Sequence, residues 1–152
     1  MLNQLGGGAD RSRRVSIRLR PGRESEAAEA DIWSGALLVA AGLFGGAGVG
    51  AAALAAHGQG GPDLTIAAQF SIMHAAAICA IAMPGSRGRR GFLISASLLA
   101  LGVLLFCGDL SSRALLGSRL FPLAAPGGGL LLIAGWLALS VTAAINKLRR
   151  AR

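Results

Sequence analysis

Charged and aromatic side chains are scarce in this 152-residue chain. Only 14% of the residues are charged, 5% are aromatic and none is tyrosine, whereas about one quarter of a typical soluble domain is charged. Few aromatic side chains lie near the basic residues, which argues against a surface that stacks on nucleic-acid bases. We therefore expect no nucleic-acid partner, although the formal net charge is +8.

Cysteine is also rare, and the sequence lacks a visible catalytic set. Cys79 and Cys107 each lie inside an apolar segment, which is typical of small buried side chains and not of a disulfide framework. No Ser–His–acid arrangement and no metal-ligand spacing is visible. We therefore predict that the chain is not an enzyme and that it holds no metal and no cofactor.

The chain instead contains long apolar runs without a polar face. A membrane-spanning helix needs about 20 predominantly apolar residues, whereas a soluble helix shows one polar side. The sequence predicts an all-α fold, a four-helix transmembrane bundle within residues 32–146, with spans at about 32–56, 64–83, 91–108 and 126–145. The longest predicted connection is a loop over residues 109–121, where Asp109 and Arg113 are spaced for an ion pair.

The segments outside the spans determine the predicted orientation. Residues 1–31 are expected to form a polar, disordered extension in which residues 24–31 are candidates for a short helix, and residues 147–152 form a basic tail. These two segments and the 84–90 turn carry most of the basic residues. The positive-inside rule then places both termini in the cytoplasm of a bacterial-type plasma (inner) membrane. The basic tails are expected to contact anionic headgroups of the lipid bilayer.

A cleaved signal peptide is the alternative interpretation of the first apolar run. Arg13-Arg14 resembles part of a twin-arginine signal, and residues 53–55 have the small side chains of a cleavage site. However, the run is too long for a typical signal, and acidic residues separate it from the arginines. We therefore interpret the first run as a membrane span.

His74 is the main candidate for a functional polar residue. It lies ten residues into the second run, which is about 15 Å of helix and hence near the membrane midplane. Trp136 is predicted at a similar depth, so we expect His74 to face the bundle interior near Trp136 and the glycines of the first span. An ionisable residue at this depth is a functional candidate. The interpretation that we favour is a neutral histidine, hydrogen-bonded to another helix.

His57 is a second candidate, predicted at the end of the first span. About 15 Å of helix separates it in depth from His74, whereas zinc ligands lie about 2 Å from one ion. We therefore interpret His57 as a polar residue at the membrane surface. Cys79 and Cys107 are predicted near opposite surfaces, so we expect neither a disulfide nor a shared metal between them.

Small residues are spaced for close contacts between helices. Gly42, Gly46 and Gly50 form overlapping GxxxG repeats on one face of the first span, which lets another helix backbone approach closely. We favour a partner helix within the same chain; the alternative is a second copy, which would give a homo-oligomer. A similar stripe follows the fourth span: Gly128, Gly135 and Thr142, beside Trp136.

The order of several short motifs resembles a known family. They are GLFGGAG at 42–48, AHG at 56–58, QFSIMH at 69–74, LFCG at 105–108, APGG at 125–128 and AGW at 134–136. Together they are similar to the small membrane proteins of domain-of-unknown-function family 423, which includes transmembrane protein 256-like proteins. The resemblance covers about residues 35–145 and implies the four-span topology, but no activity. The chain departs from the family at Phe70, where a tyrosine is usual, and at residues 108–111.

These observations predict a small structural or accessory membrane protein that acts through helix contacts. The alternative is a transporter or channel subunit for a small neutral or lipid-like solute. Small exporters of cations usually carry a carboxylate inside the membrane. No Asp or Glu lies in the predicted spans, which argues against a cationic substrate.

Overall fold

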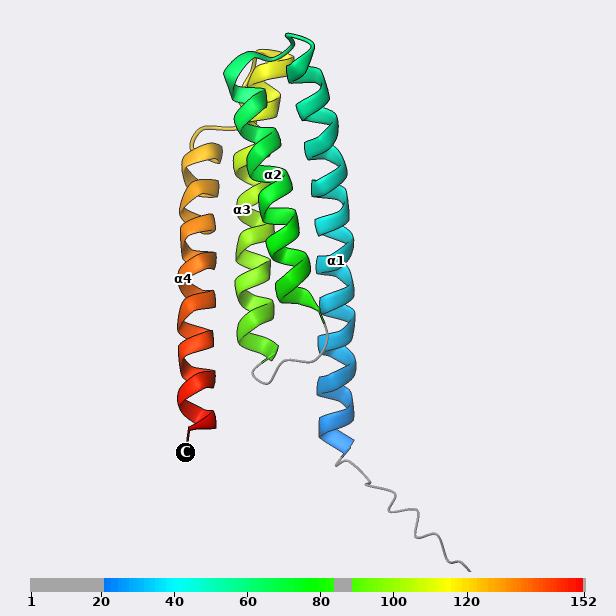
Figure 1. The fold of residues 1–152 in the computed structure, drawn as a ribbon, viewed down its shortest axis with the longest axis vertical. Helices are drawn as coiled ribbons and strands as arrows, with labels where there is room; N and C mark the ends of the chain where they lie inside the picture. The colour runs from blue at the N-terminus through cyan, green and yellow to red at the C-terminus, as the bar shows by residue number, and fades with distance from the viewer. Residues whose placement is uncertain (1–20, 84–88, 152) are drawn as a thin grey trace, which may run out of the picture.

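In the computed structural model, which describes residues 21–83 and 89–151, the chain forms an up-and-down bundle (Figure 1). The helices of these residues are α1 (Pro21–Ala56), α2 (Gly61–Ala82), α3 (Arg89–Leu116) and α4 (Ala124–Arg150). We call the end that carries the turn at residues 57–60 the loop end, and the opposite end, where α4 finishes, the tail end. The described residues contain no strand, so the predicted all-α fold is confirmed.

The length and composition of each helix suit a membrane. α2 has 22 residues, which corresponds to about 33 Å at 1.5 Å per residue, close to the thickness of the hydrocarbon layer. Within the described ranges, four helices are long and apolar enough to cross a bilayer. The architecture is therefore that of a multi-pass membrane protein.

All four helices extend beyond the predicted spans, and α1 and α3 do so the furthest. α1 begins at Pro21, so the helix considered for residues 24–31 is continuous with the first span; residues 1–20 of the predicted extension lie outside the described residues. The expected loop over 109–121 is wrong for its first part, because α3 continues to Leu116. No glycine or proline interrupts residues 109–116, and the helix ends where Gly117 adopts a φ of 70°, a conformation that favours glycine.

α3 is the central helix of the bundle. α2 packs against both α1 and α3, and α4 packs against α3, while α1 and α3 meet less closely. Among the described residues, the backbone of α4 makes no close approach to α1 or α2. Three side chains of α3, Leu93, Leu99 and Val103, are almost completely buried. The core therefore lies around α3, and α1 and α4 form opposite edges (Figure 1).

Glycine allows α3 and α4 to pack closely. A Cβ atom added to Gly128 would lie 2.5 Å from the backbone nitrogen of Phe106. A Cβ at Gly135 would lie 2.7 Å from a methyl carbon of Leu99, and a Cβ at Gly102 would lie 2.8 Å from Leu132. Small residues on both helices thus bring the two backbones together, as is common between membrane helices.

Candidate functional site

His74 lies in the middle of α2, and its side chain is only 3% exposed. Its Nδ1 atom lies 2.8 Å from the carbonyl oxygen of Phe70, one helical turn earlier. Because a carbonyl only accepts hydrogen bonds, Nδ1 carries the proton and donates it. The indole Nε1–H of Trp136 donates to Nε2 of His74 at 3.3 Å, since an indole nitrogen is a donor only. Both ring nitrogens have partners, and the arrangement is that of a neutral imidazole.

Aromatic rings surround the His74 side chain. The Phe70 ring stacks on it with a centroid distance of 5.6 Å, and Trp136 meets it edge-on at 6.0 Å. Phe106 of α3 packs against Phe70 at 5.1 Å. The cluster therefore joins α2, α3 and α4. Because the backbones of α2 and α4 do not approach each other, the His74–Trp136 hydrogen bond links these helices through side chains alone.

The surroundings of His74 do not resemble a proton pathway. Within residues 25–83 and 90–151, the acidic side chains lie towards the two ends of the bundle: Glu26, Glu29 and Asp31 towards the tail end, and Asp63 and Asp109 at the loop end. Proton relays in membranes usually consist of several ionisable groups in succession. The geometry around His74 instead supports a hydrogen bond that holds helices together.

His57 and the two cysteines are not part of this cluster. His57 is exposed just after the end of α1, at the loop end, whereas His74 lies in the middle of α2. Cys79 and Cys107 are both free thiols, the first partly buried and the second buried. Within residues 21–83 and 89–151, no group of three or more His, Cys, Asp or Glu side chains is placed to hold a metal ion.

The glycine repeat of the first span faces away from the bundle. Gly42, Gly46 and Gly50 are exposed, and a Cβ atom added to any of them would meet no atom within 4 Å. The expectation that they contact another helix of the same chain, near His74, is therefore wrong. α1 turns a different side towards α2, where a Cβ at Gly48 would lie 2.7 Å from Ile72. Glycine spacing identifies a face but not the direction in which that face points.

Short polar side chains form further links that the sequence interpretation missed. The hydroxyl of Ser71 in α2 donates to the carbonyl oxygen of Phe44 in α1 at 2.8 Å, and the hydroxyl of Ser34 donates to the carbonyl of Ala82. In the half of the bundle nearer the tail end, the indole Nε1–H of Trp33 in α1 donates to the Ser97 hydroxyl in α3 at 2.9 Å. Serine and tryptophan inside apolar runs are the sequence signal for such contacts, because hydrocarbon offers them no other partner.

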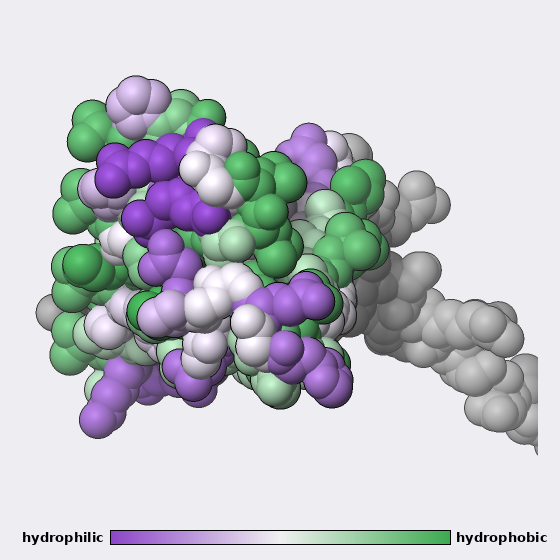
Figure 2. All heavy atoms as spheres, turned by 90° about the horizontal axis from the view of Figure 1, so that it is seen from above, coloured by the Kyte–Doolittle hydropathy of each residue, from purple (hydrophilic) through white to green (hydrophobic). Residues whose placement is uncertain are grey.

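A network of ion pairs connects the helices at the loop end. The Arg113 guanidinium lies 3.4 Å from the Asp109 carboxylate and 3.6 Å from that of Asp63. Asp109 is buried and also accepts a hydrogen bond of 2.9 Å from the backbone N–H of Leu120. Arg113 therefore connects α2 with α3, and Asp109 fixes the connection to α4. Hydrophilic residues gather over this end of the molecule, with apolar residues around them (Figure 2).

Comparison with known proteins identifies a family but assigns no activity. Residues 49–129 match the model of a family described as protein of unknown function (DUF423). No curated protein and no solved structure matches the chain. The family match covers more than half of the sequence and includes His57, His74 and the beginning of α4. The chain therefore belongs to the DUF423 family.

Proposed function

We propose that this chain is a small accessory membrane protein that acts through helix contacts, and that α1 pairs with α1 of a second copy. The observation that carries the proposal is the exposed face formed by Gly42, Gly46 and Gly50, which has open space around each glycine. α1 lies at an edge of the bundle (Figure 1). This face is therefore accessible to another helix within the bilayer.

The composition of this face suits self-association. Burial from water does not drive helix pairing inside lipid, so close packing of backbones across small residues has to stabilise it. Large apolar side chains flank the glycines, with Val39, Leu43 and Val49 each more than 60% exposed. They can pack around a second helix as the glycines approach it. A face that contacts its own copy fits a two-fold dimer, the commonest symmetry of homo-oligomers.

Filling the glycine face is expected to weaken the dimer. Gly46→Leu adds a Cβ atom that meets no atom of the same chain within 4 Å, and the position is exposed, so the bundle should fold normally. The dimer dissociation constant, measured by energy transfer between labelled copies diluted in lipid bilayers, should rise at least about tenfold, or about 1.4 kcal/mol. Gly129→Leu is the matched control, because Gly129 on α4 also has open space. A wild-type chain that stays monomeric at every dilution would contradict the proposal.

We also propose that the protein lies in a bacterial-type plasma membrane with its tail end in the cytoplasm. Arg90 and the last turn of α4, with Lys147, Arg149 and Arg150, supply basic residues at the tail end. The loop end carries Arg113 and Arg119. An excess of basic residues in short loops and tails favours the cytoplasmic side, where they also contact anionic headgroups.

Thiol labelling in intact cells tests this orientation. In a background with Cys79→Ser and Cys107→Ser, a membrane-impermeant thiol reagent should modify Gln59→Cys at the loop end and leave Ala151→Cys at the tail end unmodified. After permeabilisation, both variants should react, which controls for accessibility. Labelling of Ala151→Cys but not of Gln59→Cys in intact cells would show that the protein has the opposite orientation and would contradict the proposal.

A further inference from the structure

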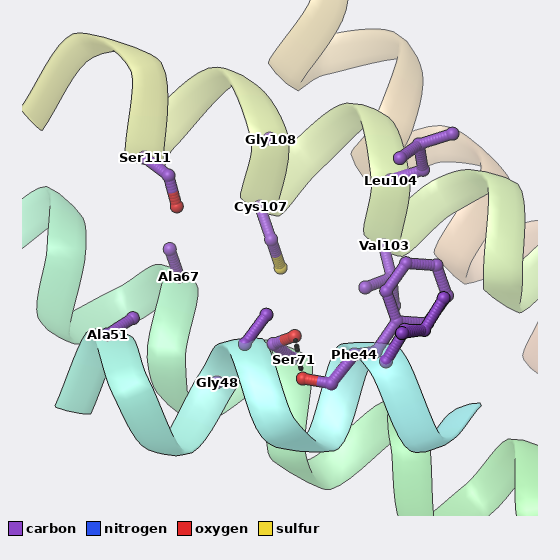
Figure 3. Close-up of a pocket in the computed structure, with 12 residues that line it drawn as sticks. Phe44, Gly48, Ala51, Ala67, Ser71, Val103, Leu104, Cys107, Gly108 and Ser111 are labelled. Carbon is purple, nitrogen blue, oxygen red and sulfur yellow. Dashed lines mark hydrogen bonds between the residues drawn. The ribbon is translucent and has the colours of Figure 1, made fainter. Parts of the chain in front are cut away.

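A cavity of about 380 Å³ lies between α1, α2 and α3, in the half of the bundle nearer the loop end (Figure 3). Small side chains leave this space open. They are Ala47, Gly48 and Ala51 of α1, Ala67 and Ser71 of α2, and Cys107, Gly108 and Ser111 of α3. Phe44 and Val103 close the cavity towards the membrane midplane (Figure 3). It is separate from the His74 cluster.

The cavity opens sideways, towards the lipid. Leu43, Ala47 and Leu104 belong to its lining and are also exposed on the surface of the bundle. They lie on α1 and α3, the pair of adjacent helices that pack least closely. From Ser111 to Val103 the cavity follows eight residues of α3, which is about 12 Å along the membrane normal. A molecule can therefore pass into it from the hydrocarbon layer without crossing water.

The lining accepts an apolar molecule. None of the lining side chains is charged. The Ser71 hydroxyl already donates to the Phe44 carbonyl, as the dashed line in Figure 3 shows. The Cys107 thiol and the Ser111 hydroxyl point into the space (Figure 3), and Ser111 lies at its loop-end side. A ligand would thus meet hydrocarbon along most of its length and one hydroxyl near the membrane surface.

We propose that this cavity binds one hydrocarbon chain of a membrane lipid, with the polar end of the lipid towards Ser111. The volume falls within the range of about 300–1,000 Å³ that is typical of small-ligand sites. A transmembrane helix is about 10 Å in diameter, so a single hydrocarbon chain fits a cavity of this volume better than a second copy does. A charged headgroup is excluded by the uncharged lining, since burying an unpaired charge is costly.

This site does not depend on pairing through α1. At 3.6 residues per turn, Ala51 lies about 100–180° around α1 from Gly42, Gly46 and Gly50. Leu43, at the mouth of the cavity, borders the glycine face. Burial agrees with this separation, because the glycines meet no neighbouring atom while Ala51 is partly buried against the cavity. A lipid chain can therefore bind to the monomer, and its binding should be unchanged in Gly46→Leu.

The test uses the full chain in lipid bilayers that contain a phospholipid with a photoreactive diazirine in one acyl chain. After irradiation and digestion, we expect cross-links to favour Cys107, which is buried and lines the cavity, several-fold over Leu101, which is exposed on the same helix but is not part of the lining. Ala51→Phe fills the cavity and should reduce cross-linking at Cys107 at least about fivefold. Ala53→Phe is the matched control, because Ala53 is exposed and lies outside the lining.

Two outcomes would overturn the proposal. The first is cross-linking distributed evenly between lining residues and other exposed residues of α1 and α3. The second is a folded Ala51→Phe variant, with wild-type helix content, in which Cys107 is labelled as before. Ser111→Leu fills the same space from α3 and takes the place of Ala51→Phe if that variant does not fold. Gly46→Leu is expected to weaken the dimer without changing the labelling of Cys107. Lipid binding and dimer formation can therefore be tested independently of each other.

Discussion

Gly128→Ala is expected to lower the free energy of unfolding by about 1–3 kcal/mol, the usual cost of an extra methyl group in a packed interior. The new Cβ would lie 2.5 Å from the backbone nitrogen of Phe106 and 2.9 Å from the carbonyl oxygen of Gly102. These are backbone atoms, which cannot rotate away as a side chain can. α4 therefore has to move away from α3 along this part of the interface.

The neighbouring glycines provide controls for this substitution. Gly127 and Gly129 have open space at the Cβ position, and alanine has a higher helix propensity than glycine by about 1 kcal/mol. Gly127→Ala and Gly129→Ala should therefore be neutral or stabilising. Reversible unfolding in lipid bicelles would compare the three variants. Equal stabilities for all three would show that α3 and α4 do not pack as described.

His74→Leu is expected to lower the free energy of unfolding by about 1–2 kcal/mol, because the indole N–H of Trp136 loses its acceptor in a region without water. Leucine retains an apolar side chain of similar size at this buried position. We therefore attribute most of the expected loss to the hydrogen bond and not to an empty cavity. The same unfolding measurement in bicelles applies.

A double-mutant cycle isolates the hydrogen bond itself. Trp136→Phe removes the N–H group but keeps an aromatic ring, and its coupling energy with His74→Leu should be about 0.6–1.7 kcal/mol. Trp33→Phe is the control, because Trp33 donates to Ser97 and not to His74. Its effect should simply add to that of His74→Leu. A coupling of zero between His74 and Trp136 would mean that the two side chains do not interact in the bilayer.

The hydrophobicity of the sequence was sufficient to predict four helices and their antiparallel order, but not where α1 begins or where α3 ends. Long uncharged runs can only be buried in lipid, and the basic turn and the glycine-rich connections separate them. Depth was also predictable, since each residue adds a fixed rise along a helix. That argument placed His74 and Trp136 at the same level, and the structure places them in contact.

The rotation of each helix about its axis could not be predicted in the same way. In a soluble helix, polar residues mark the side that faces water, but in lipid both sides are apolar. The sequence therefore did not indicate that the helix face formed by Gly42, Gly46 and Gly50 points away from the bundle. For the same reason, the sequence did not reveal the cavity beside Cys107, because its shape depends on small residues contributed by three helices.

The end of α3 illustrates a different difficulty. Asp109 and Arg113 in a connection between apolar runs look like residues of a polar loop. The structure keeps them helical and directs them towards Asp63 and the backbone of Leu120. Those partners are distant in sequence, and no local pattern indicates them. A charged helix end that caps a membrane bundle and a surface loop therefore have similar sequences.

The arrangement of neighbours also has a consequence for biosynthesis. Each helix packs mainly on the one made just before it: α2 on α1, α3 on α2 and α4 on α3. During translation, each new segment can therefore dock as soon as it leaves the insertion machinery, without waiting for a later one. Contacts between sequence neighbours also favour rapid folding. The first three helices can thus pack before α4 docks, and the docking of α4 then places Trp136 against His74.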